Sequence, residues 1–288
     1  MMNLPMFAEH ATAIAYLIAC CLMIIGIKQL NKSNTARRGT FLAALGTFIG
    51  VAAAFFDADV VQSSYDAESV FHNGYFWVFL AVAIGSAIGA ICSKAVRSTG
   101  MFKLVTLYSG FGGLATAFIA FSEFSNFTFI DVSERAVYAT DPIFALFVSL
   151  AIFLGVMTFT GSILAWGKLY EKTTERTRSG LYLLNTLLVS LTVASLVIFV
   201  VPNSDPTSRF YALLALPAIA FILGFTFVSA FSKGNTAVAV PLLNSLTGIA
   251  VAMVGFMLVN MLLIVAGALV ATSGIAITTV WYASNKKP

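Results

Sequence analysis

A few polar side chains inside otherwise apolar stretches are the residues of this chain with the most chemical potential. Asn244 stands out, because an amide with two donors and one acceptor is costly in hydrocarbon unless it is hydrogen-bonded. Hydroxyl side chains such as Ser162 say less individually, since each can return its hydrogen bond to its own helix. Two roles are consistent with Asn244: a hydrogen bond that joins two helices, or a contact with a water or proton wire.

The metal-binding and nucleophilic residue types have no pattern that indicates a site. Cys20, Cys21 and Cys92 lie in apolar stretches without a second cluster at metal-ligand spacing. His10 and His72 lie at the ends of such stretches, in segments that also carry acidic residues, where a solvated role is expected. The chain has no Walker A loop, and no Gly-x-Gly-x-x-Gly follows a predicted strand. We therefore expect no bound metal, no catalytic residue and no cofactor-binding site in this chain.

The elements that hold these residues are predicted to be nine membrane-spanning helices. Of the 288 residues, 59% are hydrophobic and 10% are charged, whereas a soluble domain carries roughly 25% charged residues. A stretch of about 20 apolar residues crosses the hydrocarbon as a helix, because its backbone polar groups are satisfied internally. The predicted spans are residues 11–30, 41–56, 75–93, 104–122, 143–166, 181–201, 210–231, 237–258 and 261–283.

The charged residues predict the orientation of these spans. All of the 16 Lys and Arg residues except Arg135 and Arg209 fall on one side of the membrane, and all of the 12 acidic residues except Glu171 and Glu175 fall on the other. The positive-inside rule then predicts an N-terminus outside and a C-terminus on the positive, cytoplasmic or matrix, side. An odd number of spans requires the two ends to lie on opposite sides, which agrees.

The fold class expected is therefore an all-α polytopic membrane protein with one transmembrane domain over residues 1–288 and no extramembrane domain. The lipid bilayer is the first expected partner. The net charge of +4 does not indicate nucleic acid, because the basic residues lie in short loops where topology explains them.

Small residues recur at helical spacing and predict close packing of helices. The glycines expected to serve this purpose are Gly85, Gly89, Gly112, Gly113, Gly161, Gly248, Gly267 and Gly274.

Several segments together resemble a known family. They are GSAIGAICSKAV (85–96), FKLVTLYSGFGGLA (102–115), GVMTFTGSILAWGKL (155–169) and the long run that begins VPLLNSLTGIAV at residue 240 and ends at residue 277. They resemble, in the same order, the membrane domain of the beta subunit of proton-translocating NAD(P) transhydrogenase. That resemblance implies nine helices with the N-terminus outside, as the charges do.

The resemblance also implies a proton route coupled to hydride transfer between peripheral nucleotide domains. Carried over by motif, the family's serine falls on Ser162 and its asparagine on Asn244. The family's histidine falls on Ser109, or on Tyr108 if the register shifts by one, and its acidic residue falls on Asn235. A phenol with a pKa of about 10 stays protonated at neutral pH, whereas an imidazole titrates near ~6.5. An aliphatic hydroxyl does not ionise in this range at all, so the titratable positions of the family are replaced.

Two functions follow as hypotheses. In the first, the chain is a non-catalytic structural or assembly subunit of a larger, respiratory-type membrane complex with a lost or altered proton path. In the second, it is the proton-translocating half of a transhydrogenase, with NAD(H) and NADP(H) bound only by partner subunits. The chain alone is not expected to transfer hydride, because it stops at Pro288, before the NADP(H) domain of the family. The family pairs into dimers, so a homodimer is one expected arrangement, in a bacterial or mitochondrial inner membrane.

Overall fold

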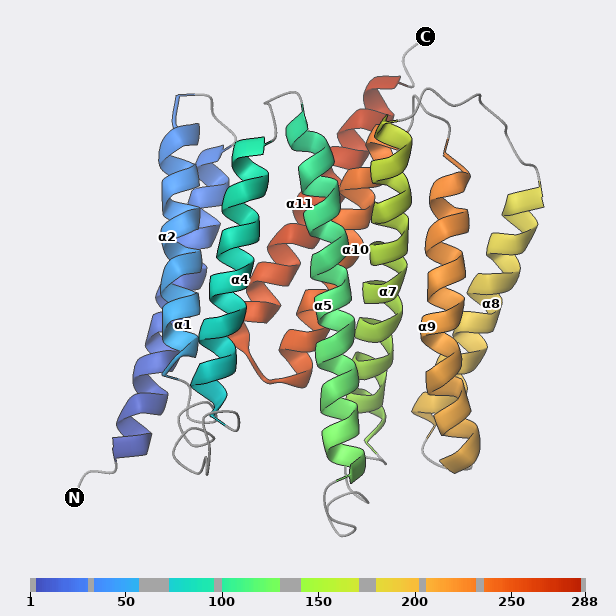
Figure 1. Cartoon of the computed structure of the whole chain (residues 1–288), viewed down its shortest axis with the longest axis horizontal. Helices are drawn as coiled ribbons and strands as arrows, with labels where there is room; N and C mark the ends of the chain where they lie inside the picture. Colours follow the sequence, from blue (N-terminus) through green and yellow to red (C-terminus); the bar gives the residue numbers. More distant parts are fainter. Residues whose placement is uncertain are drawn as a thin grey trace. The chain divides into compact units, whose positions relative to one another are not determined.

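The computed structural model describes residues 4–30, 34–56, 73–95, 100–129, 141–170, 180–201, 206–231 and 236–285. Within these ranges the chain folds into nine α-helices and no strand (Figure 1). Eight of the helices are long and apolar enough to cross a membrane. The predicted all-helical membrane fold is therefore confirmed, and the protein is a multi-pass membrane protein.

The chain divides into two compact units, residues 1–100 and 101–288, which are described separately. The first unit contains α1 (Leu4–Leu30), α2 (Ala36–Ala54) and α4 (Gly74–Ala95). α2 is the one helix of the described nine that is not among the eight long and apolar enough to cross a membrane. It has 19 residues and begins with Ala36, Arg37 and Arg38, so charge occupies its first turn.

In the first unit, the backbones of α1 and α2 approach each other closely at glycine residues. A Cβ added at Gly39 would fall 2.6 Å from the carbonyl oxygen of Gly26, and one added at Gly46 would fall 2.8 Å from that of Ala19. Only glycine allows this approach, which is the usual means of holding helices together where lipid is as apolar as the side chains. α4 is tied to the end of α2, because the Tyr75 hydroxyl donates to the carbonyl oxygen of Phe55 at 2.8 Å.

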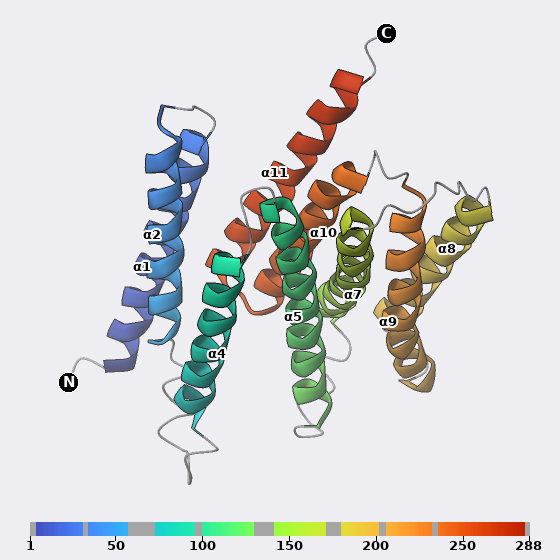
Figure 2. The same ribbon diagram turned by 45° about the horizontal axis from the view of Figure 1, so that its top comes forward.

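The second unit contains the remaining six helices, and α7 is central to it (Figures 1 and 2). α7 packs against α5, α9 and α10, while α8 packs on α9 and α11 packs on α10. The helices are α5 (Met101–Phe129), α7 (Pro142–Tyr170), α8 (Gly180–Val200), α9 (Pro206–Ser229), α10 (Thr236–Met257) and α11 (Met261–Asn285).

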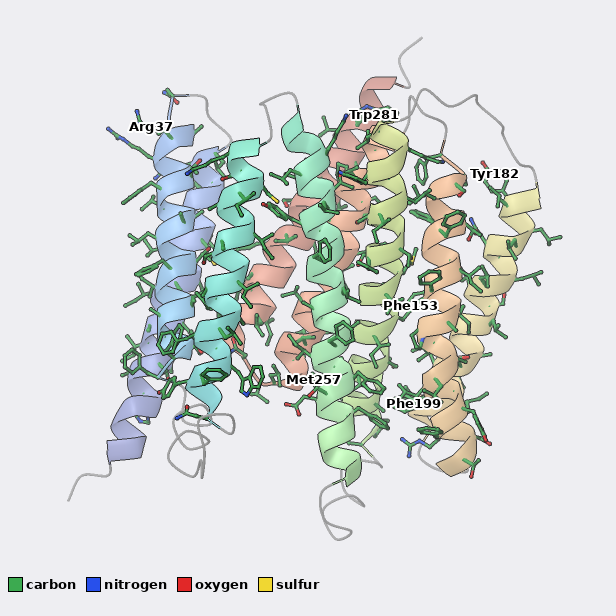
Figure 3. The ribbon with its side chains drawn as sticks, viewed as in Figure 1. Arg37, Phe153, Tyr182, Phe199, Met257 and Trp281 are labelled. Atoms are coloured by element: carbon green, nitrogen blue, oxygen red, sulfur yellow. The ribbon has the colours of Figure 1, made fainter. Side chains whose placement is uncertain are left out.

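The largest apolar cluster of the second unit joins the early part of α7 to α8, α9 and the end of α10. Val148, Phe199, Leu213 and Val254 are all buried in it. Phe199 also receives a basic side chain: the Arg209 guanidinium lies 5.7 Å from the ring centroid, and Arg209 Nε donates to the carbonyl oxygen of Phe199 at 2.9 Å (Figure 3). Arg209, one of the two exceptions to the charge pattern, thus caps the end of α8.

Candidate functional site

The residues of chemical interest meet where α5 and α10 approach each other, beside α7. Ser109 of α5 is buried, with 6% of its surface exposed. Its hydroxyl lies 3.1 Å from that of Thr247 on α10. The Thr247 hydroxyl is also 3.2 Å from two carbonyl oxygens, those of Ser109 and Leu243. A pair of hydroxyls therefore joins the two helices, and each side chain has a partner.

The approach of α5 to α7 is made by glycines. A Cβ at Gly110 would fall 2.8 Å from the Cβ of Ser162, and one at Gly113 would fall 2.8 Å from the carbonyl oxygen of Gly155. A Cβ at Gly155 would in turn lie 3.0 Å from the backbone nitrogen of Ala117. At this separation the facing helix leaves no room for a Cβ at any of these three glycines. We call the contact of α5 with α7 and α10 at Ser109, Gly110, Gly113, Gly155, Thr158, Ser162 and Thr247 the hydroxyl seam.

Most hydroxyls near the seam are satisfied by their own helices. Thr158 donates to the carbonyl oxygen of Gly155 at 3.0 Å, and Thr116 donates to that of Gly113 at 2.7 Å. Ser162 differs, because it is 0% exposed and its hydroxyl has no hydrogen-bond partner among the residues that the structure describes. A buried hydroxyl without a partner loses its solvation without compensation, so Ser162 marks a point in the seam with unused hydrogen-bonding capacity.

The two positions left open for the family's histidine differ in their burial. Ser109 points into the seam, whereas Tyr108 is 44% exposed and points away from it. Asn244 is half-buried on α10, one turn before Thr247. Asn235 lies outside the residues that the structure describes.

The glycines expected to pack helices fall into three groups. Backbone or side-chain atoms lie too close for an added Cβ at Gly113, Gly161, Gly248, Gly267 and Gly274. At Gly112 the nearest atom, a methyl carbon of Thr247, would be 3.5 Å away, which is ordinary contact. At Gly85 and Gly89 an added Cβ would meet no described atom within 4 Å.

Sequence reasoning missed several residues of the site. Thr247 and Gly155 are central to the seam but were not among the predicted positions, although Thr247 follows Asn244 by three residues and so lies near its face of the helix. Among the predictions from sequence, Lys168 served only as one of the basic residues that predict the orientation of the helices. Its ammonium group donates to the carbonyl oxygens of Val228 at 2.9 Å and Phe231 at 3.1 Å, so α7 caps the end of α9.

The seam contains glycines and hydroxyls, which can hold helices together or relay a hydrogen bond but do not titrate near neutral pH. Among the residues that the structure describes, no group of three or more His, Cys, Asp or Glu could hold a metal ion.

Comparison with known proteins agrees with the resemblance of the motifs. The family model of the NAD(P) transhydrogenase beta subunit matches residues 12–285. The NAD(P) transhydrogenase subunit beta of Rhodospirillum rubrum is 30% identical over 264 residues, which are 91% of this chain and 53% of that protein. A second sequence of the same description and species gives the same figures. The chain thus spans about half the length of these relatives. By the extent of the match, the chain belongs to the NAD(P) transhydrogenase beta subunit family.

Proposed function

We propose that this chain is a structural membrane subunit of a larger assembly, in which the hydroxyl seam holds α5, α7 and α10 together and does not carry protons. One observation carries the proposal: the Ser109 hydroxyl is buried and paired with Thr247 at 3.1 Å. Ser109 is one of the two positions, with Tyr108, where the resemblance would put the family's histidine. A hydroxyl paired in this way stabilises a helix contact and offers no group that binds and releases a proton at neutral pH.

Close packing on both sides of this pair supports a holding role. Gly110 and Gly113 bring α5 against α7, and Gly248 brings α10 against α11, where its Cβ would fall 2.5 Å from the backbone nitrogen of Ala271. Interhelical contacts of this kind depend on van der Waals packing and on hydrogen bonds of modest strength, roughly 0.6 kcal/mol each on average.

The second candidate is a proton-translocating half whose NAD(H) and NADP(H) domains belong to partner subunits. The unpaired hydroxyl of Ser162 favours it, because a buried oxygen with free hydrogen-bonding capacity can hold a water. In this reading protons pass along Ser162, Ser109 and Asn244 by way of water, without a titratable side chain. Either reading puts the chain in an energy-coupling inner membrane, with further membrane subunits as partners and a homodimer as one arrangement.

Purification of the chain from its native membrane in mild detergent, followed by mass spectrometry of the proteins that accompany it, tests the proposal. The structural role predicts a multi-subunit membrane complex whose other members include proteins unrelated to transhydrogenase. Recovery of transhydrogenase nucleotide-binding subunits alone would contradict it and favour the second candidate. Ser109→Ala should lower the yield of the complex, because it removes one of the two hydroxyls that join α5 to α10.

A further inference from the structure

The turn between α10 and α11 is short, strained and apolar. Val259 has a φ of 52°, the only positive value at a non-glycine residue in the described part of the chain. It is 89% exposed. A β-branched side chain clashes with its own backbone in this left-handed conformation, and turns in water use glycine or asparagine there. Its neighbours Phe256, Leu258 and Met261 are also exposed.

The backbone of this turn is closed by its own hydrogen bonds. The Val259 N–H donates to the carbonyl oxygen of Phe256 at 3.3 Å, and the Asn260 N–H donates to that of Gly255 at 2.8 Å. This is the Schellman arrangement, in which Val259 occupies the place where glycine is usual. The Asn260 side chain then accepts from the Leu263 N–H at 3.1 Å and caps the start of α11. The N–H groups of Leu258, Val259 and Asn260 thus all have carbonyl partners in α10, and that of Leu263 has a side-chain partner.

The depth of the turn follows from its neighbours in the second unit. α5 and α10 run in the same direction from the paired Ser109 and Thr247. A helix rises about 1.5 Å per residue. On α5 the first acidic residue, Glu123, lies about 14 residues or ~21 Å from Ser109. On α10, Val259 lies about 12 residues or ~18 Å from Thr247. The turn therefore ends about 3 Å before the level of Glu123.

A second measure on α7 agrees with the first. The rings of Phe147 and Phe256 are stacked at 5.2 Å. α7 runs opposite to α10, so both chains can be followed from the stacked rings toward the acidic side. On α7, Asp141 lies about six residues or ~9 Å from Phe147 in that direction. On α10, Val259 lies at most ~4.5 Å from Phe256 in the same direction. In Figure 1 the turn ends short of the lower ends of α5 and α7. Met257, the last residue of α10, is labelled in Figure 3.

We propose that the α10–α11 turn is immersed in the hydrocarbon of the bilayer, where Val259, Leu258, Phe256 and Met261 contact lipid acyl chains. Irregular backbone exposed to lipid is costly where its polar groups lack partners, and this turn pairs the N–H groups of Leu258, Val259 and Asn260 with carbonyl oxygens of α10. In hydrocarbon an exposed valine costs nothing to solvate, whereas in water its exposure would add to the strain of its backbone. The inference is independent of the role of the hydroxyl seam.

Spin labelling tests it in the purified assembly, reconstituted into phosphatidylcholine vesicles. The label is attached to Val259→Cys, with Cys20, Cys21 and Cys92 replaced by alanine. Collisions with oxygen, which concentrates in hydrocarbon, are compared with collisions with a water-soluble nickel chelate. Leu191→Cys, exposed in the middle of α8, is the lipid reference, and Asn34→Cys, exposed between α1 and α2, is the aqueous reference.

We expect the oxygen-to-nickel ratio at position 259 to match that at position 191 and to exceed that at position 34 several-fold. A ratio like that of position 34 would overturn the proposal, because the turn would lie in water. Low collision rates with both reagents would overturn it too, because a protein partner would then cover the turn. Met261→Cys provides the same measurement at a second exposed position if the variant at position 259 does not assemble.

Discussion

Gly155→Ala is expected to lower the free energy of unfolding by about 1–3 kcal/mol, the usual cost of overpacking a close contact. The added methyl group would meet the carbonyl oxygen of Gly113 and lie 3.0 Å from the backbone nitrogen of Ala117. Neither atom is the end of a flexible side chain, so α5 and α7 must separate. Titration of the protein from mild detergent into SDS, followed by circular dichroism, measures the change.

Gly167→Ala is the matched control on the same helix. Among the residues that the structure describes, no atom lies within 4 Å of a Cβ added there. Alanine is favoured over glycine inside a helix by roughly 0.5–1 kcal/mol, so this variant should be as stable as the wild type or slightly more stable. Equal stability of the two variants would contradict the close contact of α5 with α7.

Lys168→Met should cost about 2–3 kcal/mol, because hydrogen bonds from a charged donor contribute more than neutral ones. The ammonium group donates to the carbonyl oxygens of Val228 and Phe231, at the end of α9. Methionine keeps much of the apolar stem and removes the donor. The Phe231 carbonyl oxygen then loses the ammonium group, and the Val228 carbonyl oxygen keeps only the Phe231 N–H at 3.2 Å. The same SDS titration measures the loss.

Lys94→Met is the comparison for the charge itself. Lys94 lies in the last turn of α4 and is exposed. Its replacement removes the same charge from a helix end without removing a bond to a second helix, so a change below about 0.5 kcal/mol is expected, as for most surface substitutions. If both lysine variants lost the same stability, the cap of α9 by Lys168 would not be the cause.

Hydropathy predicted the helices well, because each span must be apolar and must satisfy its own backbone. The boundaries were less well predicted. α5 was expected over residues 104–122 and extends over Met101–Phe129, and α1 begins at Leu4 where residue 11 was expected. A helix continues past the hydrocarbon wherever its residues favour it, and hydropathy records only the apolar part.

The seam was predicted only in part, for a physical reason. In a soluble protein the apolar face of a helix identifies the side that packs in the core. In lipid both faces are apolar, so the periodic spacing of apolar residues no longer shows which face packs against other helices. Sequence therefore left Tyr108 and Ser109 as alternatives, and the structure shows that Ser109 is the buried one. The pairing with Thr247 depends on a helix 138 residues away in the chain, which no local pattern contains.

Proton flux through the reconstituted assembly tests the central claim most directly. Liposomes with an internal pH dye receive a pH jump, and the rate is compared among the wild type, Ser109→Ala and Ser162→Ala, with assembly confirmed for each by gel filtration. If the seam only holds helices, assembled Ser109→Ala and Ser162→Ala transport protons at the wild-type rate within the error of the measurement. A tenfold or larger loss of flux in either assembled variant would contradict the structural role and establish the seam as a proton path.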